Sequence, residues 1–354
     1  MIPLANCDIT AVERAIVSEE MQEGIISGTG RRVAEFEAIW RTVTDRKHAV
    51  AVANGTVALE LALNAIGVRK GDEVIVPALT FAAPAAAVRR NGGTVVFADV
   101  DPVSWTIDVD HVRQLVNERT VAIIAVNVMG HPCDFEQLFS IANPRGIWII
   151  EDAAESHGAE YEQRYAGSFG DISILSFHAN KTITTGEGGM ILTDNDQIAD
   201  HVRLAANHGM RFAYVHEMVG TNARMTNLSA AIGVGQMKRW NEIMYYRTMI
   251  EQRYLDMLKP PFFPKPKAAW GRSRLWLQAV TVEDVNRNDV VAHLRSLDID
   301  ARAIWVALPD LPLYYQRGFE TARRISQTTF WLPTFNRMTE DDFECIERGL
   351  SAWM

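Results

Sequence analysis

The stretch H-A-V-A-V-A-N-G-T-V-A-L-E-L-A-L-N-A-I-G, His48 to Gly67, indicates how this chain is built. Its first five residues form a short apolar run typical of a buried strand. Gly55 to Ile66 then carries Val57, Leu61 and Ala65 at helical spacing, and the glycine that closes the stretch is a common helix terminator. The stretch therefore predicts one strand, one turn and one helix.

The same alternation of apolar runs and helical patterns continues from about Lys47 to Asp194. This pattern is typical of a mainly parallel sheet between helices, so we predict an α/β fold. Its large domain is expected to hold a mainly parallel seven-stranded sheet, with a smaller C-terminal α+β domain after it. The expected strands are His48–Val52, Glu73–Pro77, Thr94–Asp99, Val121–Val126, Ile147–Glu151, Asp171–Phe177 and Gly189–Thr193.

Two domains are expected, of residues 1–245 and 246–354, with the N-terminal residues 1–25 packing on the small domain. The proline-rich run K-P-P-F-F-P-K-P-K, Lys259 to Lys267, predicts a boundary or an extended connector. Beyond this run we expect one strand and two helices, over Leu275–Val282, Asn288–Leu297 and Glu340–Trp353.

Composition excludes several classes of partner. The net charge is −9 and no block of lysine and arginine occurs, which argues against nucleic acid or an anionic membrane as the main partner. Cys7, Cys133 and Cys345 are far apart and form no C-x-x-C motif, so neither a disulfide framework nor a metal site is expected. With no recognisable export signal or membrane-spanning run, the expected compartment is the cytoplasm.

A lysine in a glycine-rich turn is the first candidate for chemistry. Ser176 to Met190 reads S-F-H-A-N-K-T-I-T-T-G-E-G-G-M and places Lys181 directly after a predicted strand. The nearby glycines permit tight backbone paths around a bound molecule. A surface lysine on a hairpin is the alternative, and for an isolated lysine it is the better interpretation.

The segment E-D-A-A-E-S-H, Glu151 to His157, adds a carboxylate that favours the chemical interpretation. In open parallel sheets, ligands bind outside the carboxyl ends of the strands, so Asp152 is expected to face that crevice. Pyridoxal phosphate needs an acid partner on its ring nitrogen, because the protonated ring withdraws electrons from the reacting carbon. Lys181 and Asp152 together therefore predict a pyridoxal-phosphate site. An N-cap of a following helix is the alternative for Asp152.

Two further segments fit a planar, phosphorylated cofactor. Ala53 to Thr56, A-N-G-T, opens the first helix, where free N–H groups and Gly55 favour a phosphate, although Asn54 as an ordinary N-cap explains the same letters. Pro77 to Phe81, P-A-L-T-F, sets Phe81 at the end of the second strand, where its ring is expected to stack on the pyridine. A core phenylalanine is the alternative.

Together these segments resemble the DegT-type sugar aminotransferases, a branch of the fold-type-I pyridoxal-phosphate enzymes, over nearly the whole chain. The resemblance also includes G-D-E-V-I-V-P, G-S-F-G-D-I-S and R-M-T-N-L-S-A-A-I-G. G-H-P-C-D at Gly130 to Asp134, together with the N-K-T-I-T-T-G-E-G-G-M run, looks most like the GDP-perosamine synthases, which aminate C4 of GDP-4-keto-6-deoxymannose. The resemblance implies a place in O-antigen or other polysaccharide biosynthesis.

The resemblance implies a role for each matching residue. Lys181 would form the Schiff base and move the proton, and Asp152 would hold the pyridine nitrogen. L-Glutamate is the implied donor, with pyridoxamine phosphate as the intermediate form of the cofactor. The resemblance also implies that Gly55, Thr56 and Ser176 contact the phosphate and that Phe81 and Glu155 contact the ring. It implies a homodimer with shared sites, in which Asn222 reaches the phosphate bound by the neighbouring subunit. His178 and Arg224 would lie near the substrate.

The substrate stays open at this point. Ala303–Leu311 lacks the histidine of the aromatic–Pro–x–His run found in perosamine synthases, and Asn127–Met129 reads N-V-M where they have H-L-Y. A UDP- or dTDP-linked sugar, or a 3-keto sugar, is the main alternative. A C3-dehydratase relative would replace Lys181 by histidine, and a regulatory relative that only binds the cofactor is the alternative outside the enzymes. The candidate partners of a pyrophosphate are Arg31, Arg32, Arg211 and Arg302.

Overall fold

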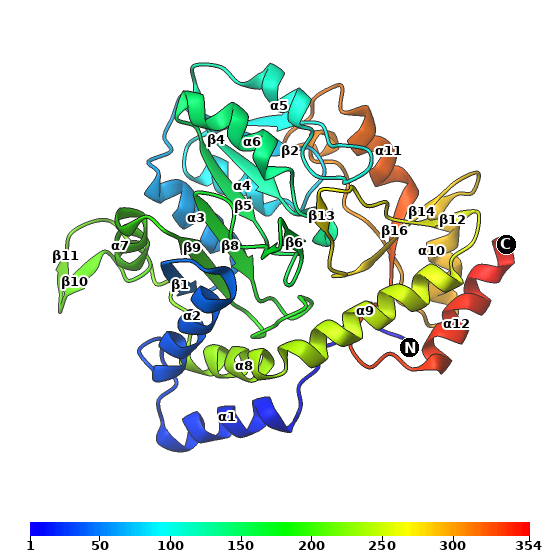
Figure 1. Cartoon of the computed structure of the whole chain (residues 1–354), viewed down its shortest axis with the longest axis horizontal. Helices are drawn as coiled ribbons and strands as arrows, with labels where there is room; N and C mark the ends of the chain where they lie inside the picture. The colour runs from blue at the N-terminus through cyan, green and yellow to red at the C-terminus, as the bar shows by residue number, and fades with distance from the viewer.

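A seven-stranded sheet forms the centre of the larger part of the chain, and the computed structural model describes residues 1–354 (Figure 1). Its strands are β1 (His48–Val52), β2 (Glu73–Pro77), β3 (Thr94–Ala98), β4 (Thr120–Val126), β5 (Trp148–Asp152), β8 (Ile172–Ser176) and β9 (Gly189–Thr193). In the order β1-β9-β8-β5-β4-β2-β3, the strands from β8 to β3 run parallel, whereas β9 is antiparallel to both of its neighbours. The predicted sheet is confirmed, and every predicted strand agrees to within about one residue at each end.

Helices cover both faces of this sheet. One face packs against α3 (Gly55–Ala65), α4 (Ala83–Arg90) and α7 (Asp196–Ala205). The other face packs against α2 (Arg31–Thr44), α5 (Val109–Leu115), α6 (Phe135–Ala142) and α8 (Asn227–Lys238). Because the central strands are buried on both faces, their sequences are continuous apolar runs. No helix of the chain combines the length and the apolar character needed to cross a bilayer.

A four-stranded antiparallel sheet organises the C-terminal part, in the order β12-β14-β16-β15. Its strands are β12 (Phe262–Pro264), β14 (Gln278–Val282), β15 (Arg302–Ala303) and β16 (Thr329–Leu332). The helices α10 (Arg287–Ser296) and α12 (Glu340–Leu350) share a separate hydrophobic core with this sheet, and α11 (Glu320–Thr328) packs toward the core of the large sheet. The predicted smaller α+β part is therefore present.

The proline-rich run Lys259 to Lys267 is not simply a connector. It contains β12, which pairs with β14 at the edge of the small sheet. An edge strand tolerates Pro264, because a proline there need not remove a hydrogen bond between two strands. The strand expected over Leu275–Val282 is also shorter than predicted, since β14 begins at Gln278.

Short elements complete the fold. The strands β6 (Glu160–Tyr161), β7 (Arg164–Tyr165) and β13 (Gly271–Arg272) form a small sheet, and β10 (Met210–Phe212) and β11 (Val215–His216) form a hairpin. This hairpin projects away from the body of the molecule, at the left of Figure 1. The short 3-10 turns are η1 (Val128–Gly130), η2 (Asn143–Arg145), η3 (Leu308–Asp310) and η4 (Ser351–Trp353).

The long helix α9 (Trp240–Met257) belongs to both parts of the chain and runs from α8 toward α12 (Figure 1). Met244 packs in a core of the large sheet, whereas Ile250 packs in the core of the small sheet. The division between residues 245 and 246 thus falls inside a continuous helix, and we keep it as a proposal. Ile2 bridges Ile299, so the first residues lie against the C-terminal part.

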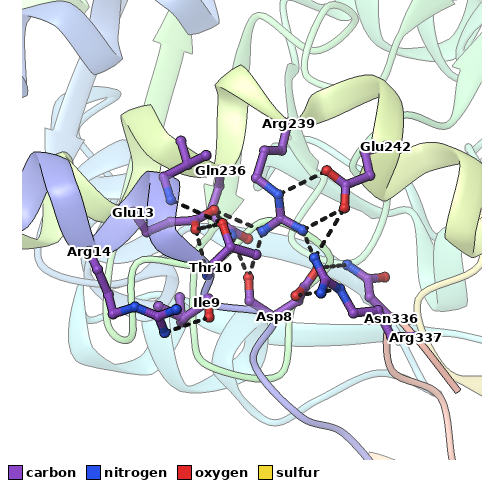
Figure 2. Close-up of polar contacts among 11 residues, drawn as sticks. Asp8, Ile9, Thr10, Glu13, Arg14, Gln236, Arg239, Glu242, Asn336 and Arg337 are labelled. Atoms are coloured by element: carbon purple, nitrogen blue, oxygen red, sulfur yellow. Dashed lines mark hydrogen bonds and ion pairs between the residues drawn. The ribbon is translucent and has the colours of Figure 1, made fainter.

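A buried ionic network ties the N-terminal segment to the junction of α8 and α9 (Figure 2). Arg239, at that junction, pairs with Asp8, with Glu13 of α1 (Ala11–Glu23) at 3.0 Å and with Glu242 at 3.0 Å. Arg337 joins from the loop after β16 and lies 3.2 Å from Asp8. Burial alone would raise the pKa of Glu13, but hydrogen bonds led by those from Thr10 lower it to about 2. The network therefore joins the N-terminal segment and the loop after β16 to the start of α9.

Candidate active site

A cavity of about 710 Å³ lies between the large sheet and the C-terminal part. On one side it meets the ends of β5 and β8, where Asp152 and Ser176 stand. On the other side it is lined by Trp276, Trp305 and Trp331. A crevice beyond the carboxyl ends of parallel strands is the place where open α/β sheets bind their ligands.

Eight of the ten site residues predicted from the sequence line this single cavity, and two do not. The cavity brings together residues from four separate segments of the chain, which supports their joint function. The eight residues are Gly55, Thr56, Phe81, Asp152, Glu155, Ser176, His178 and Lys181. Asn222 and Arg224 lie outside its lining.

Lys181 is buried in the cavity and is not a surface residue of a hairpin. Its side chain is only 11% exposed, and its Nζ lies 3.7 Å from Oε1 of Glu155. The same Nζ lies 3.8 Å from the ring centroid of Trp276. Burial lowers the pKa of Lys181, whereas the carboxylates of Glu155 and Asp152 act in the opposite direction. An amine with a lowered pKa gives up its proton more readily and is a better nucleophile at neutral pH.

Asp152 ends β5 with its carboxyl group buried. Burial raises the pKa of Asp152 to about 7; the N–H of Ala154 opposes this rise, and the charge of Glu155 adds to it. No helix follows β5, so the N-cap alternative is wrong; instead Oδ1 of Asp152 accepts a hydrogen bond from the N–H of Ala154 at 3.1 Å. A carboxyl group that titrates near neutral pH is suited to share a proton with the nitrogen of a bound ring.

Glu155 and His178 occupy different depths of the cavity. Glu155 is buried, and its Oε2 accepts a hydrogen bond from the N–H of Met129 at 2.9 Å. His178 has a half-exposed side chain at the rim, and its Nδ1 lies 2.9 Å from the side-chain oxygen of Asn180. Glu155 is therefore placed to act on the amine, and His178 is placed to meet a larger molecule entering the cavity.

The first turn of α3 forms a cradle that fits a phosphate. Asn54 is the N-cap, and its side chain accepts a hydrogen bond from the N–H of Val57 at 2.9 Å, so the N-cap interpretation is confirmed. The N–H groups of Gly55 and Thr56, earlier in this turn, have no partner within the helix. A Cβ atom on Gly55 would lie 2.8 Å from the Cβ of Ser176, so only glycine leaves this corner open. The cradle and the Asp152–Lys181 pair line one cavity, as a phosphorylated planar cofactor requires.

Phe81 lies at the mouth of the cavity and not in the core. Its side chain is 55% exposed, which is unusual for phenylalanine and excludes the core alternative. An exposed ring beside a cavity is available for stacking on a bound ring.

Asn222 and Arg224 lie in the strand-like segment that runs past the end of β1. Arg224 bridges Val52 and Asn222 bridges Asn207, and Asn222 is exposed. The Nε atom of Arg224 is buried without a hydrogen-bond partner. Within one chain neither residue lines the cavity.

Only one of the four candidate arginines lines the cavity. Arg302 does so, while paired with Asp300 at 2.7 Å. The others are held by carboxylates elsewhere: Arg31 and Arg32 by Glu20 of α1, and Arg211 by Asp200 and Glu217. Arg90, which no sequence motif indicated, also lines the cavity and is largely exposed.

The tryptophans of the C-terminal part are the main feature that sequence reasoning missed. Trp276 and Trp305 stack with centroids 6.2 Å apart, and Trp331 meets them edge-on at 5.9 and 5.0 Å. Trp305 belongs to the run Ala303–Leu311, which lacks the expected histidine. An apolar aromatic surface therefore occupies that side of the cavity. No local pattern signals it, because the three residues come from different segments.

Comparison with known proteins agrees with this geometry. Residues 8–350 match the DegT/DnrJ/EryC1/StrS aminotransferase family. The GDP-perosamine synthase of Caulobacter vibrioides is 37% identical over 351 residues, covering 96% of this chain and 94% of the relative. The GDP-perosamine synthase of Escherichia coli O157:H7 is 34% identical over 319 residues, covering 89% and 88% of the two chains.

One solved structure is similar to this chain over its whole length. The PMP-form of Spr1654 from Streptococcus pneumoniae superimposes with a TM-score of 0.92 at 25% identity, covering 100% of both chains. The match extends over both parts of the fold. The resemblance stated from the sequence motifs is therefore confirmed, and this chain belongs to the DegT/DnrJ/EryC1/StrS aminotransferase family.

Proposed function

We propose that this protein transfers an amino group from L-glutamate to C4 of a nucleotide-linked 4-keto-6-deoxy sugar, as a GDP-perosamine synthase does. The observation that carries the proposal is the convergence of the Lys181 amine, the Asp152 carboxyl group and the first turn of α3 on one cavity. The predicted cofactor, pyridoxal phosphate, is confirmed by membership of an aminotransferase family and by a neighbour solved in PLP- and PMP-forms.

Four residues of the cavity have a physical task in this reaction. Bound pyridoxal phosphate supplies an electron sink that stabilises negative charge on the carbon being deprotonated. Lys181 would anchor the cofactor, and its free amine would act as the general base and acid for the transferred proton. Asp152 keeps a proton on the ring nitrogen. Gly55 and Thr56 bind the phosphate through N–H groups at the positive end of α3.

The sugar and the nucleotide would bind on the side of the cavity that is lined by Trp305, Trp331 and Arg302. The relatives named GDP-perosamine synthase favour a GDP-linked substrate. The indole rings of Trp305 and Trp331 offer an apolar surface, which suits the methyl group and C–H bonds of a deoxy sugar better than a hydroxymethyl group. Because the histidine is missing, a UDP- or dTDP-linked sugar remains the second candidate. Of the four arginines proposed as partners of the pyrophosphate, Arg302 is the one that lines the cavity.

A panel of keto-sugars tests the proposal. Purified protein would be mixed with pyridoxal phosphate, L-glutamate and 4-keto-6-deoxy sugars linked to GDP, UDP or dTDP, and the release of 2-oxoglutarate would be measured. We expect GDP-4-keto-6-deoxymannose to react at least about tenfold faster than the others, a difference of roughly 1.4 kcal/mol. Preference for a UDP or dTDP sugar would transfer the assignment to the second candidate. Release from none of them, by protein that binds the cofactor, would favour a regulatory role.

We also propose that the protein is a homodimer whose active sites are shared. Asn222 is exposed outside the cavity of its own chain, and the hairpin of β10 and β11 presents Phe212, Tyr214 and Val215 to solvent. Exposed apolar side chains on a projecting element are typical of a surface that a partner covers. In a symmetric pair, Asn222 of each subunit would reach the phosphate site of the other.

Subunit mixing tests whether the sites are shared. Lys181→Ala and Asn222→Asp homodimers should both be inactive, the second because its carboxylate repels the phosphate. After refolding or co-expression as a mixture, half of the dimers are hybrids with one intact site each, so about a quarter of wild-type activity should return. Recovery of no activity in dimers shown to be mixed would mean that Asn222 serves its own chain.

A further inference from the structure

One tryptophan of the C-terminal part lies directly on the amine of Lys181. The ring centroid of Trp276 is 3.8 Å from Nζ of Lys181, about van der Waals distance for an ammonium group on an aromatic face. The ring is 3% exposed, so water competes little for this contact. Of the three tryptophans around the cavity, Trp276 is the one with this contact.

Trp276 is fixed by two hydrogen bonds with different partners. Its indole N–H donates to the carbonyl oxygen of Asn180, the residue before Lys181, at 2.9 Å. Its own carbonyl oxygen accepts a hydrogen bond from the buried guanidinium of Arg247 at 2.9 Å. Its ring also stacks against Trp305. These contacts fix the position of the Trp276 ring relative to the backbone at Asn180 and Lys181.

Charged and titratable groups surround the amine on its other sides. Glu155 lies 3.7 Å away, and the charge of Asp152 also acts on the amine. The buried ring of His157 has its pKa lowered to about 3 by burial and then by the charges of Lys181 and Arg247, so it is neutral. The indole face is an uncharged surface that nevertheless favours the protonated amine.

We propose that Trp276 is a positioning residue that holds the protonated amine of Lys181 by a cation–π contact and fixes its direction through Asn180. The inference rests on the proposed function, in which Lys181 alternates between free amine and ammonium. In this proposal Trp276, from the C-terminal part, influences the protonation and the orientation of Lys181, which follows a strand of the large sheet. The packing of the two parts thereby adds to the effects of burial, Glu155 and Asp152 on the proton affinity of the reactive amine.

Fluorinated tryptophans at position 276, introduced by codon suppression, test this contact. Fluorine withdraws charge from the ring face, leaves the shape of the ring nearly unchanged and keeps its N–H as a donor to Asn180, whereas Trp276→Leu would remove the N–H and open space for water. The measurement is the pH dependence of the rate at which unloaded protein captures pyridoxal phosphate, followed as visible absorbance. The probe titrates identically in all variants, so differences between variants report on the amine.

With one, two and three fluorines, we expect the midpoint of the rate profile to move stepwise to lower pH, by about one pH unit in total. The sign follows because a weaker ring face holds the ammonium form less well, so the proton leaves at lower pH. The same series at Trp305, which stacks on Trp276 and does not contact the amine, is the matched control and should leave the midpoint in place.

The outcomes separate this inference from the proposed function. An unchanged midpoint across the series at 276, in protein that captures the cofactor normally, would overturn the role of Trp276 alone. An equal shift at 276 and 305 would also overturn it, because a general effect on the cavity would then explain the data. Failure of wild-type protein to capture pyridoxal phosphate would instead contradict the proposed function.

Discussion

Lys181→Ala is expected to abolish transamination, with turnover reduced by at least about 10⁴-fold. The same amine anchors the cofactor and carries the proton, so its removal deletes two functions together. The cavity offers no other amine near Glu155 and Asp152 to replace it. The measurement is the release of 2-oxoglutarate from glutamate and the reactive keto-sugar under saturating cofactor.

Lys265→Ala is the matched control for this loss. Burial also lowers the pKa of Lys265, to about 7, but this lysine lines a separate small pocket. Its removal should leave turnover within about twofold of the wild type. Substantial turnover by Lys181→Ala, or equal losses in the two variants, would contradict the assignment of the lysine.

Asp152→Asn is expected to lower turnover by about 10³-fold while making the unloaded protein more stable above neutral pH. Asparagine keeps an oxygen for the N–H of Ala154, so the local turn should persist. It has no negative charge to hold a proton on the ring nitrogen, so the electron sink is weakened. Asp152→Glu, which retains the charge, should lose less activity than Asp152→Asn.

The stability change follows from the raised pKa. Burial raises the pKa of Asp152 from 3.8 to about 7, so the folded protein binds this proton more tightly than the unfolded chain. Folding stability is therefore lost as pH rises from about 4 to about 7, by the order of 2–4 kcal/mol. Asp152→Asn removes this loss, so its free energy of unfolding should exceed that of the wild type at pH 8 and approach it at pH 4. If the wild type and Asp152→Asn had equal free energies of unfolding at pH 8, ionisation of Asp152 would not destabilise the folded protein, which would contradict this prediction.

The sheet was predictable because its strands are buried on both faces. Such strands are short apolar runs, and their ends are marked by turn residues such as Asn54 and Gly67. β12 was missed because prolines mask a strand signal, although an edge strand accepts them. The two-residue strands such as β6 and β7 were missed because so short a segment has no measurable periodicity.

The part of the site that follows individual strands was predictable for a related reason. Asp152 and the Lys181 turn come directly after β5 and β8, and parallel neighbours end at the same edge of the sheet. Trp276 is nearly a hundred residues beyond Lys181 and reaches it only through the packing of the C-terminal part against the large sheet. Its sequence neighbourhood, R-L-W-L-Q, is that of any buried strand, so local patterns contain no information about this contact.

Mapping the residue that captures pyridoxal phosphate tests directly whether Lys181 is the amine that binds the cofactor. The protein would be incubated with the cofactor, reduced with borohydride, digested and analysed by mass spectrometry. We expect a phosphopyridoxyl group on Lys181 and on no other lysine, with the label lost in Lys181→Ala. A label on Lys265 or on a surface lysine, with Lys181 unmodified, would contradict it.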